Sequence, residues 1–272
     1  MRTVGRALFA LALGAVVAPG ALSVIAPRLR AQGLPVNGEP ARVPWESGET
    51  LTYDVRFGAI KVGTSRLRVV GQEPVRGRMT WRVRFSVSGG TFFYKVNDLY
   101  ESWMDIVTLN SLRYNQDLEQ GSRDRERTFE IFPERAVYRE TTRGTADRPS
   151  VADPLDDGSF LYFIRTVPLE VGRTYSFSRY FRPDRNPVLI RVLRRERVKV
   201  PAGEFSAIVI QPIIKTSGIF AEGGQAEIWL SDDADRMMLQ MKSRLSFGTL
   251  NLYLRAFQRS AATSSVGSDT IP

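Results

Sequence analysis

Apolar and polar residues alternate along most of this chain, and this period of two constrains its fold more than any other feature. In the segment TLTYDVRF one face carries four apolar side chains, Leu51, Tyr53, Val55 and Phe57. In TWRVRFSV the apolar positions again share one face, with Arg82 and Arg84 on the other. The pattern recurs in SLRYNQDLE, RTYSFSRYF, PVLIRVLRRERVKV and TLNLYLRAF. Successive side chains of a strand point to opposite faces, so the pattern predicts β-strands that each bury one face.

Glycines fall between these apolar runs and indicate breaks between strands, at Gly71, Gly77, Gly89, Gly90, Gly121, Gly203, Gly223, Gly224 and Gly248. Short breaks predict antiparallel strands, because parallel strands need long crossover connections. The pattern indicates about a dozen strands. An open, twisted sheet with that many strands curls or splits into two packed sheets. The sequence therefore predicts one mainly β domain over residues 45–258, built on a large antiparallel curled sheet or a half-open barrel.

One segment, DPLDDGSFLYFIRTVPLEVG, differs from the strands by its clustered aspartates and its helical spacing. Asp153, Asp156 and Asp157 are compatible with an ion site or with an acid–base pair. The segment lacks the alternating oxygen ligands and the closing glutamate of a calcium loop. Aspartate is a preferred helix N-cap and Pro168 a natural stop, which favours a helix over about Leu155 to Val167.

This predicted helix carries an apolar face at i, i+3, i+4 and i+7 spacing, formed by Phe160, Phe163, Ile164 and Val167. We expect the helix to lie against the concave face of the sheet, because a curled sheet has to fill that side with side chains, a helix or a ligand. One short helix covers only part of so large a sheet. The four residues are therefore the predicted ligand-binding, cavity-facing side of the helix.

A second acidic group, in WLSDDADRMML, lies between two apolar runs. Asp232, Asp233 and Asp235 invite a metal-binding interpretation, but aspartates in such positions ordinarily bond to nearby backbone amides in a turn. The pattern predicts a turn here and another in VPAGEF, Val200 to Phe205.

The chain contains no cysteine and no histidine. Without cysteine it has no disulfides and no thiolate nucleophile. Without histidine it lacks the residue that most often serves as a general base or as a zinc ligand. It also lacks a Gly-x-Ser-x-Gly elbow and a Ser-x-x-Lys motif. We expect a protein that is not an enzyme and that has no cofactor and no structural metal.

The N-terminus, MRTVGRALFALALGAVVAPGALSVIAPRLRAQG, has a basic start, a short apolar core and then small residues, as in a secretory signal peptide. Cleavage is compatible with positions after Ala18, Gly20 or Ala31, and an uncleaved anchor that runs to Ala26 is the alternative. We expect export to the periplasm. The predicted division is a signal peptide at residues 1–31, a linker at 32–44 and a disordered tail at 259–272.

The formal net charge of the chain is +9, to which the arginines of the predicted signal peptide contribute. The remaining arginines alternate with apolar residues along the strands, whereas nucleic-acid binding usually needs a concentrated basic patch. We therefore expect no nucleic-acid partner. A weak peripheral attraction to anionic lipid headgroups is compatible with the charge.

Four motifs, taken in order, resemble one bacterial family. They are GETLTYDVRFGAIKVGTSRL, with Gly48, Glu49, Tyr53 and Gly63, then DPLDDGSFLYFIR, VKVPAGEFSAIVI and AEIWLSDDADRMMLQM. The series spans about Pro44 to Phe257 and resembles the cell-envelope family catalogued as domain of unknown function 3108. The resemblance implies an exported, mainly antiparallel β protein and carries no reaction or catalytic residue. Its general architecture is similar to that of curved-sheet periplasmic carriers that hold acyl chains.

From this shape we predict a monomeric periplasmic binding protein for an apolar or amphipathic, lipid-like ligand, with aromatic residues of the concave face lining its pocket. The alternative is that the same aromatic residues pack into a dry core. The protein is then a cell-envelope scaffold, or an interaction module that docks a partner on an exposed strand edge.

Overall fold

The computed structural model describes residues 38–91, 94–214, 226–245 and 248–259. The predicted signal peptide, most of the predicted tail, the first part of the linker and the pair Gly223 and Gly224 lie outside the described residues. In the described part, no helix is long and apolar enough to cross a membrane.

Strands dominate the structure. The first half of the chain provides β1 (Thr50–Phe57), β2 (Ile60–Val75), β3 (Arg78–Thr91), β4 (Tyr94–Asp105), β5 (Ser111–Gln120), β6 (Arg123–Phe132), β7 (Val137–Glu140) and β8 (Asp147–Pro149). The second half provides α1 (Asp157–Phe163), β9 (Thr174–Phe177), β10 (Val188–Val200), β11 (Gly203–Ile213), β12 (Glu227–Ser231), β13 (Met238–Leu245) and β14 (Gly248–Gln258). Short 3₁₀ helices are η2 (Pro133–Arg135), η3 (Thr141–Arg143), η4 (Ile164–Thr166) and η5 (Pro183–Arg185).

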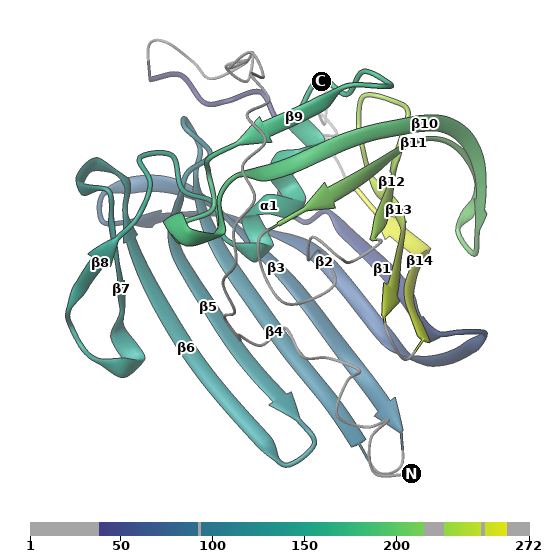
Figure 1. Cartoon of the computed structure of the whole chain (residues 1–272), viewed down its shortest axis with the longest axis horizontal. Helices are drawn as coiled ribbons and strands as arrows, with labels where there is room; N and C mark the ends of the chain where they lie inside the picture. Colours follow the sequence, from purple (N-terminus) through teal and green to yellow (C-terminus); the bar gives the residue numbers. More distant parts are fainter. Residues whose placement is uncertain (1–37, 92–93, 215–225, 246–247, 260–272) are drawn as a thin grey trace, which may run out of the picture.

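The fourteen strands of the described residues form one antiparallel sheet, in the order β8-β7-β6-β5-β4-β3-β2-β1-β14-β13-β12-β11-β10-β9. Because β1 pairs with β14, the first and last strands lie inside the sheet, and β8 and β9 are its edges. The sheet curls around a concave side without closing (Figure 1). The predicted fold, a mainly β protein with a curled antiparallel sheet, is confirmed.

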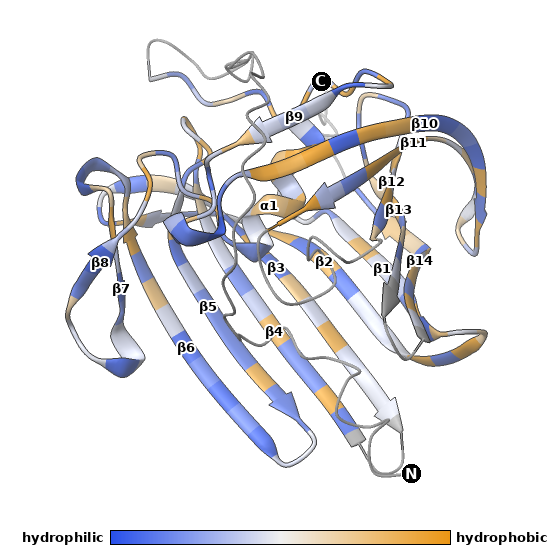
Figure 2. Cartoon of the chain, viewed as in Figure 1, coloured by the Kyte–Doolittle hydropathy of each residue, from blue (hydrophilic) through white to orange (hydrophobic). Residues whose placement is uncertain are grey.

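The sequence alternation corresponds to the two faces of the sheet, and Figure 2 shows hydrophobic and hydrophilic residues alternating along its strands. Tyr53 of β1 and Val83 of β3 are buried in the core. On the opposite face of β3, Arg82 and Arg84 both pair with Glu101 of β4, and Arg82 Nη2 lies 2.8 Å from Glu101 Oε1. The strand number exceeds the expected dozen because β7 and β8 have only four and three residues, too few to show a period.

Three glycines that we expected at breaks, Gly71, Gly89 and Gly90, lie inside strands instead. At Gly71 the register between β2 and β3 shifts, which indicates a bulge. Gly89 pairs with Gly63 of β2, and a Cβ atom on Gly89 would lie 2.3 Å from the carbonyl oxygen of Val62. Gly63 and Gly89 thus allow the backbones of β2 and β3 to approach closely. The local sequence does not distinguish a glycine with this role from a glycine in a turn.

The segment between the two sheet edges crosses the concave side and contains α1, which packs against β3 and β4 (Figure 1). The prediction of one helix against the concave face is confirmed. The predicted bounds, Leu155 to Val167, were too wide. The last turn is the 3₁₀ helix η4, and Leu155 forms an isolated parallel bridge with Tyr180.

Candidate functional site

The start of α1 is fixed by Asp156, which is fully buried. Its Oδ1 accepts hydrogen bonds from the backbone amides of Gly158 (2.8 Å) and Ser159 (2.9 Å), and the Ser159 hydroxyl accepts from the Asp156 amide (2.8 Å). This reciprocal pair is a capping box. Ser102 of β4 also donates to Oδ1, at 2.5 Å, and so joins the cap to the sheet. The interpretation of the acidic cluster as a helix start is confirmed.

The second acidic group forms the predicted turn between β12 and β13. Asp233 Oδ1 accepts hydrogen bonds from the Ser231 hydroxyl and from the backbone amides of Asp235 and Arg236. The turn in VPAGEF is confirmed as well, since β10 ends at Val200 and β11 begins three residues later. Within the described ranges, no group of three or more acidic, histidine or cysteine side chains is placed to hold a metal ion.

Asp157, one residue beyond the cap, takes part in a network of side chains. Its Oδ2 accepts from the Tyr114 hydroxyl (2.9 Å) and its Oδ1 from the Tyr180 hydroxyl (2.8 Å). Gln116 donates to Tyr114 Oη (2.8 Å) and Arg185 to Tyr180 Oη (3.2 Å). Burial raises the pKa of both tyrosines well above the ordinary value, so both hydroxyls remain protonated donors. The Asp157 carboxylate is therefore held in one orientation.

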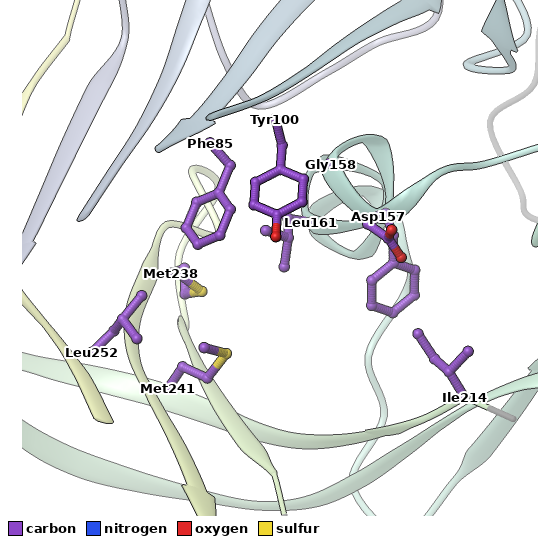
Figure 3. Close-up of a pocket in the computed structure, with 10 residues that line it drawn as sticks. Phe85, Tyr100, Asp157, Gly158, Leu161, Ile214, Met238, Met241 and Leu252 are labelled. Atoms are coloured by element: carbon purple, nitrogen blue, oxygen red, sulfur yellow. The ribbon is translucent and has the colours of Figure 1, made fainter. Parts of the chain in front are cut away.

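Beside this network lies a cavity of about 50 Å³ between α1 and facing parts of the curled sheet (Figure 3). Its wall comes from β3, β4, α1, β13, β14 and the residue that follows β11. The lining residues are Phe85, Tyr100, Asp157, Gly158, Phe160, Leu161, Ile214, Met238, Met241 and Leu252. The wall is almost entirely apolar. Its polar side-chain groups are the Asp157 carboxylate and the Tyr100 hydroxyl, and Met238, Met241 and Leu252 lie across the cavity from them (Figure 3).

The Tyr100 hydroxyl is buried and has no hydrogen-bond partner among the residues that the structure describes. The ring stacks on Phe85, with the two centroids 5.8 Å apart, so the hydroxyl position is defined by packing. A buried polar group without a partner costs about 1–3 kcal/mol. In the wall of a cavity, such a group offers a hydrogen bond to whatever enters.

The four residues predicted to face a cavity are all buried. Phe160 lines the cavity, together with its neighbour Leu161. Phe163 packs edge-on against Phe177 of β9, with centroids 5.2 Å apart, and Ile164 and Val167 join the core. The structure thus divides the four between the cavity and the surrounding core.

The rest of the wall was not identified from sequence. Tyr100 and Met241 occupy apolar positions of alternating strands, which is a signal that they face inward. The positions that meet across the concave side depend on the curl of the sheet and on the pairing of β1 with β14. Neither is visible in a local pattern.

Two buried carboxyls, those of Asp156 and Asp98, are expected to make the stability depend on pH between about 5 and 7. Burial raises the pKa of Asp156 and that of Asp98 to about 6, whereas an unfolded aspartate titrates near ~4. Between these values the folded chain binds more protons than the unfolded chain. The free energy of unfolding is therefore expected to rise by about 1 kcal/mol per carboxyl as the pH falls from about 7 to about 5.

Urea unfolding at the two pH values measures this rise. Asparagine is also a good N-cap, so Asp156→Asn keeps the acceptor but cannot titrate, and the rise should shrink by about 1 kcal/mol. Asp124→Asn, at an exposed position of β6, should leave the rise unchanged. If the rise is the same in Asp156→Asn as in the wild type, Asp156 does not titrate in this range.

Among solved structures, the chain is similar to a β-barrel-like protein of domain of unknown function DUF1849 from Brucella abortus, with a TM-score of 0.51 and 8% identity over 81% of this chain and 100% of that chain. It also matches a candidate lipoprotein from Parabacteroides distasonis (TM-score 0.36, 10% identity, 79% and 98% covered). A candidate exported protein with a YmcC-like fold from Bacteroides fragilis matches at a TM-score of 0.32 and 12% identity, with 80% and 98% covered. At these identities, the first likeness concerns the fold alone.

Among curated proteins, none matches the chain significantly. Residues 52–255 match the family described as "Protein of unknown function (DUF3108)". The match includes nearly the whole sheet, from β1 to β14, and agrees with the resemblance of the four sequence motifs. The chain belongs to this family.

Proposed function

We propose that the protein is a non-enzymatic binding protein that holds one end of an apolar or amphipathic cell-envelope ligand in the cavity between α1 and the curled sheet. The observation that carries this proposal is the composition of the cavity wall. Apolar side chains from facing parts of the sheet enclose the space, with two polar groups on one side. Sites for small apolar ligands commonly combine an apolar wall with a few placed polar groups.

The cavity volume limits what can enter. At about 50 Å³, the cavity is smaller than the ~150 Å³ cavity that binds benzene in an engineered protein. A few atoms at one end of a ligand fit this space, and a complete acyl chain does not. Met238 and Met241 form part of the wall, and methionine side chains are flexible enough to adapt to different ligand shapes.

Export to the periplasm is part of the proposal. It is supported by the basic start, the short apolar core and the small residues of the N-terminal 31 residues. A monomer is sufficient for the proposed role, because one chain provides the whole described wall of the cavity.

Methyl NMR of methionine-labelled protein tests binding at this cavity. The chain has six methionines. Met238 and Met241 line the cavity, whereas Met79 is 44% exposed and reports on non-specific contact. Titration with n-octanol should shift the Met238 and Met241 signals until they saturate, and leave the Met79 signal in place.

Two tryptophan variants provide a matched comparison. Met241→Trp fills the cavity and should abolish the response of Met238. Ile60→Trp places the same side chain at a position that is 70% exposed and should keep the response. If folded wild-type protein gives no Met238 or Met241 response up to the solubility limit of octanol, the cavity is a dry part of the core and the scaffold alternative is favoured.

A further inference from the structure

The two polar groups of the cavity wall define what the polar end of a ligand must offer. The Tyr100 hydroxyl is buried without a partner in the described structure, and the Asp157 carboxylate lies in the same wall (Figure 3). Because the cavity is only about 50 Å³, a polar group inside it lies near both.

The free hydrogen-bonding positions of Asp157 and Tyr100 limit which polar group a ligand can carry. A carboxylate can accept about four hydrogen bonds, and that of Asp157 receives one at each oxygen, from Tyr114 and from Tyr180. Those two tyrosines direct their protons at Asp157 and not at a ligand. The wall therefore offers acceptor positions at Asp157 and, at Tyr100, a group that can both donate and accept.

The charge of the cavity wall further limits which polar group a ligand can carry. Asp157 is the one charged residue in the described wall, so a carboxylate or phosphate end would place two negative charges together in an apolar site, which is unfavourable. Arg185 donates to Tyr180 Oη and places a positive charge close to Asp157. A cationic ligand is therefore not needed to balance the carboxylate.

We infer that the cavity recognises its ligand by an uncharged hydroxyl group, which donates to the Asp157 carboxylate and accepts from the Tyr100 hydroxyl. This inference rests on the proposed function and specifies the polar end of the ligand. An alcohol satisfies the unpartnered Tyr100 hydroxyl and the free capacity of Asp157 at once. A fatty acid or a phosphorylated headgroup does not.

Three probes of equal chain length test this inference by the same methionine NMR titration. They are n-octanol, octanoate and octylammonium. Octanol should bind at Met238 and Met241 with the lowest Kd, at least about tenfold below that of octanoate, which corresponds to one unfavourable charge contact.

Tyr100→Phe removes only the hydroxyl. It should weaken octanol binding about three- to tenfold, as expected for one neutral hydrogen bond. In the absence of ligand it should raise the melting temperature, because the hydroxyl that is removed has no partner there. Tyr162→Phe is the matched control, since the Tyr162 hydroxyl is also buried without a partner among the described residues but does not line the cavity. It should leave octanol binding unchanged.

The outcomes separate this inference from the function on which it rests. If octanoate or octylammonium binds as tightly as octanol, or if Tyr100→Phe keeps the full octanol affinity, the inference is overturned while the cavity remains a binding site. If none of the three probes shifts Met238 or Met241, the proposed function itself fails.

Discussion

Replacing Arg165 with methionine is expected to lower the free energy of unfolding by about 3–5 kcal/mol. Arg165 lies in η4 and pairs with Glu49, which directly precedes β1, through Nη1–Oε1 and Nη2–Oε2 distances of 2.6 and 2.9 Å. The two side chains are 3% and 7% exposed. The guanidinium also donates to the carbonyl oxygens of Asp235 and Pro44. Without the arginine, Glu49 is left as a buried carboxylate that has lost its partner.

Urea unfolding of single and double variants measures this effect. Glu49→Leu combined with Arg165→Met should be less destabilised than Arg165→Met alone, because neither charge is then left without the other. Arg173→Met is the control, since Arg173 and Glu170 form an exposed ion pair, and it should change the stability by less than about 1 kcal/mol. If Arg165→Met is as stable as this control, the buried pair does not hold η4 against β1.

Replacing Gly89 with valine is expected to cost more than about 3 kcal/mol, above the range usual for overpacked cores. A Cβ atom at this position would lie 2.3 Å from the Val62 carbonyl oxygen and 2.5 Å from the Cα atom of Gly63. Both are backbone atoms of β2, so the contact cannot be relieved by rotating a side chain. The two strands have to separate, and β3 is one of the two strands that pack on α1.

Thermal or urea unfolding of this variant is compared with that of Ser88→Val. Ser88 is the preceding residue of β3 and its side chain is exposed, so the same added bulk should change the stability by about 0.5 kcal/mol or less. Equal stability of the two variants would show that the β2–β3 approach at Gly89 is not tight.

The strands and their buried faces could be predicted because their pattern is local. Tyr53 and Val83 lie at apolar positions of segments in which apolar and polar residues alternate, and both are buried. The start of α1 could be predicted for the same reason, because a capping box is formed by residues three positions apart. The prediction of a break at Gly89 is wrong because the role of this glycine depends on its pairing with Gly63 in another strand, which the local sequence does not show.

The cavity was only partly predictable. The helical spacing predicts Phe160 on the cavity-facing side of the helix, and Phe160 does line the cavity. The sequence does not show that Asp156 forms the cap while Asp157, one position later, turns to Tyr114 and Tyr180. It also does not show that Tyr100 and Met241, more than a hundred residues apart, face the same space. That placement follows from the curl of the sheet.

Native mass spectrometry of the protein isolated from its own cell envelope would show whether the cavity is occupied in the cell. We expect a discrete added mass that is released on collisional activation, that is lost from Met241→Trp and that is retained by Ile60→Trp. A wild-type protein that carries no added mass but is recovered with a stable protein partner would contradict the binding function and favour a scaffold with a dry core.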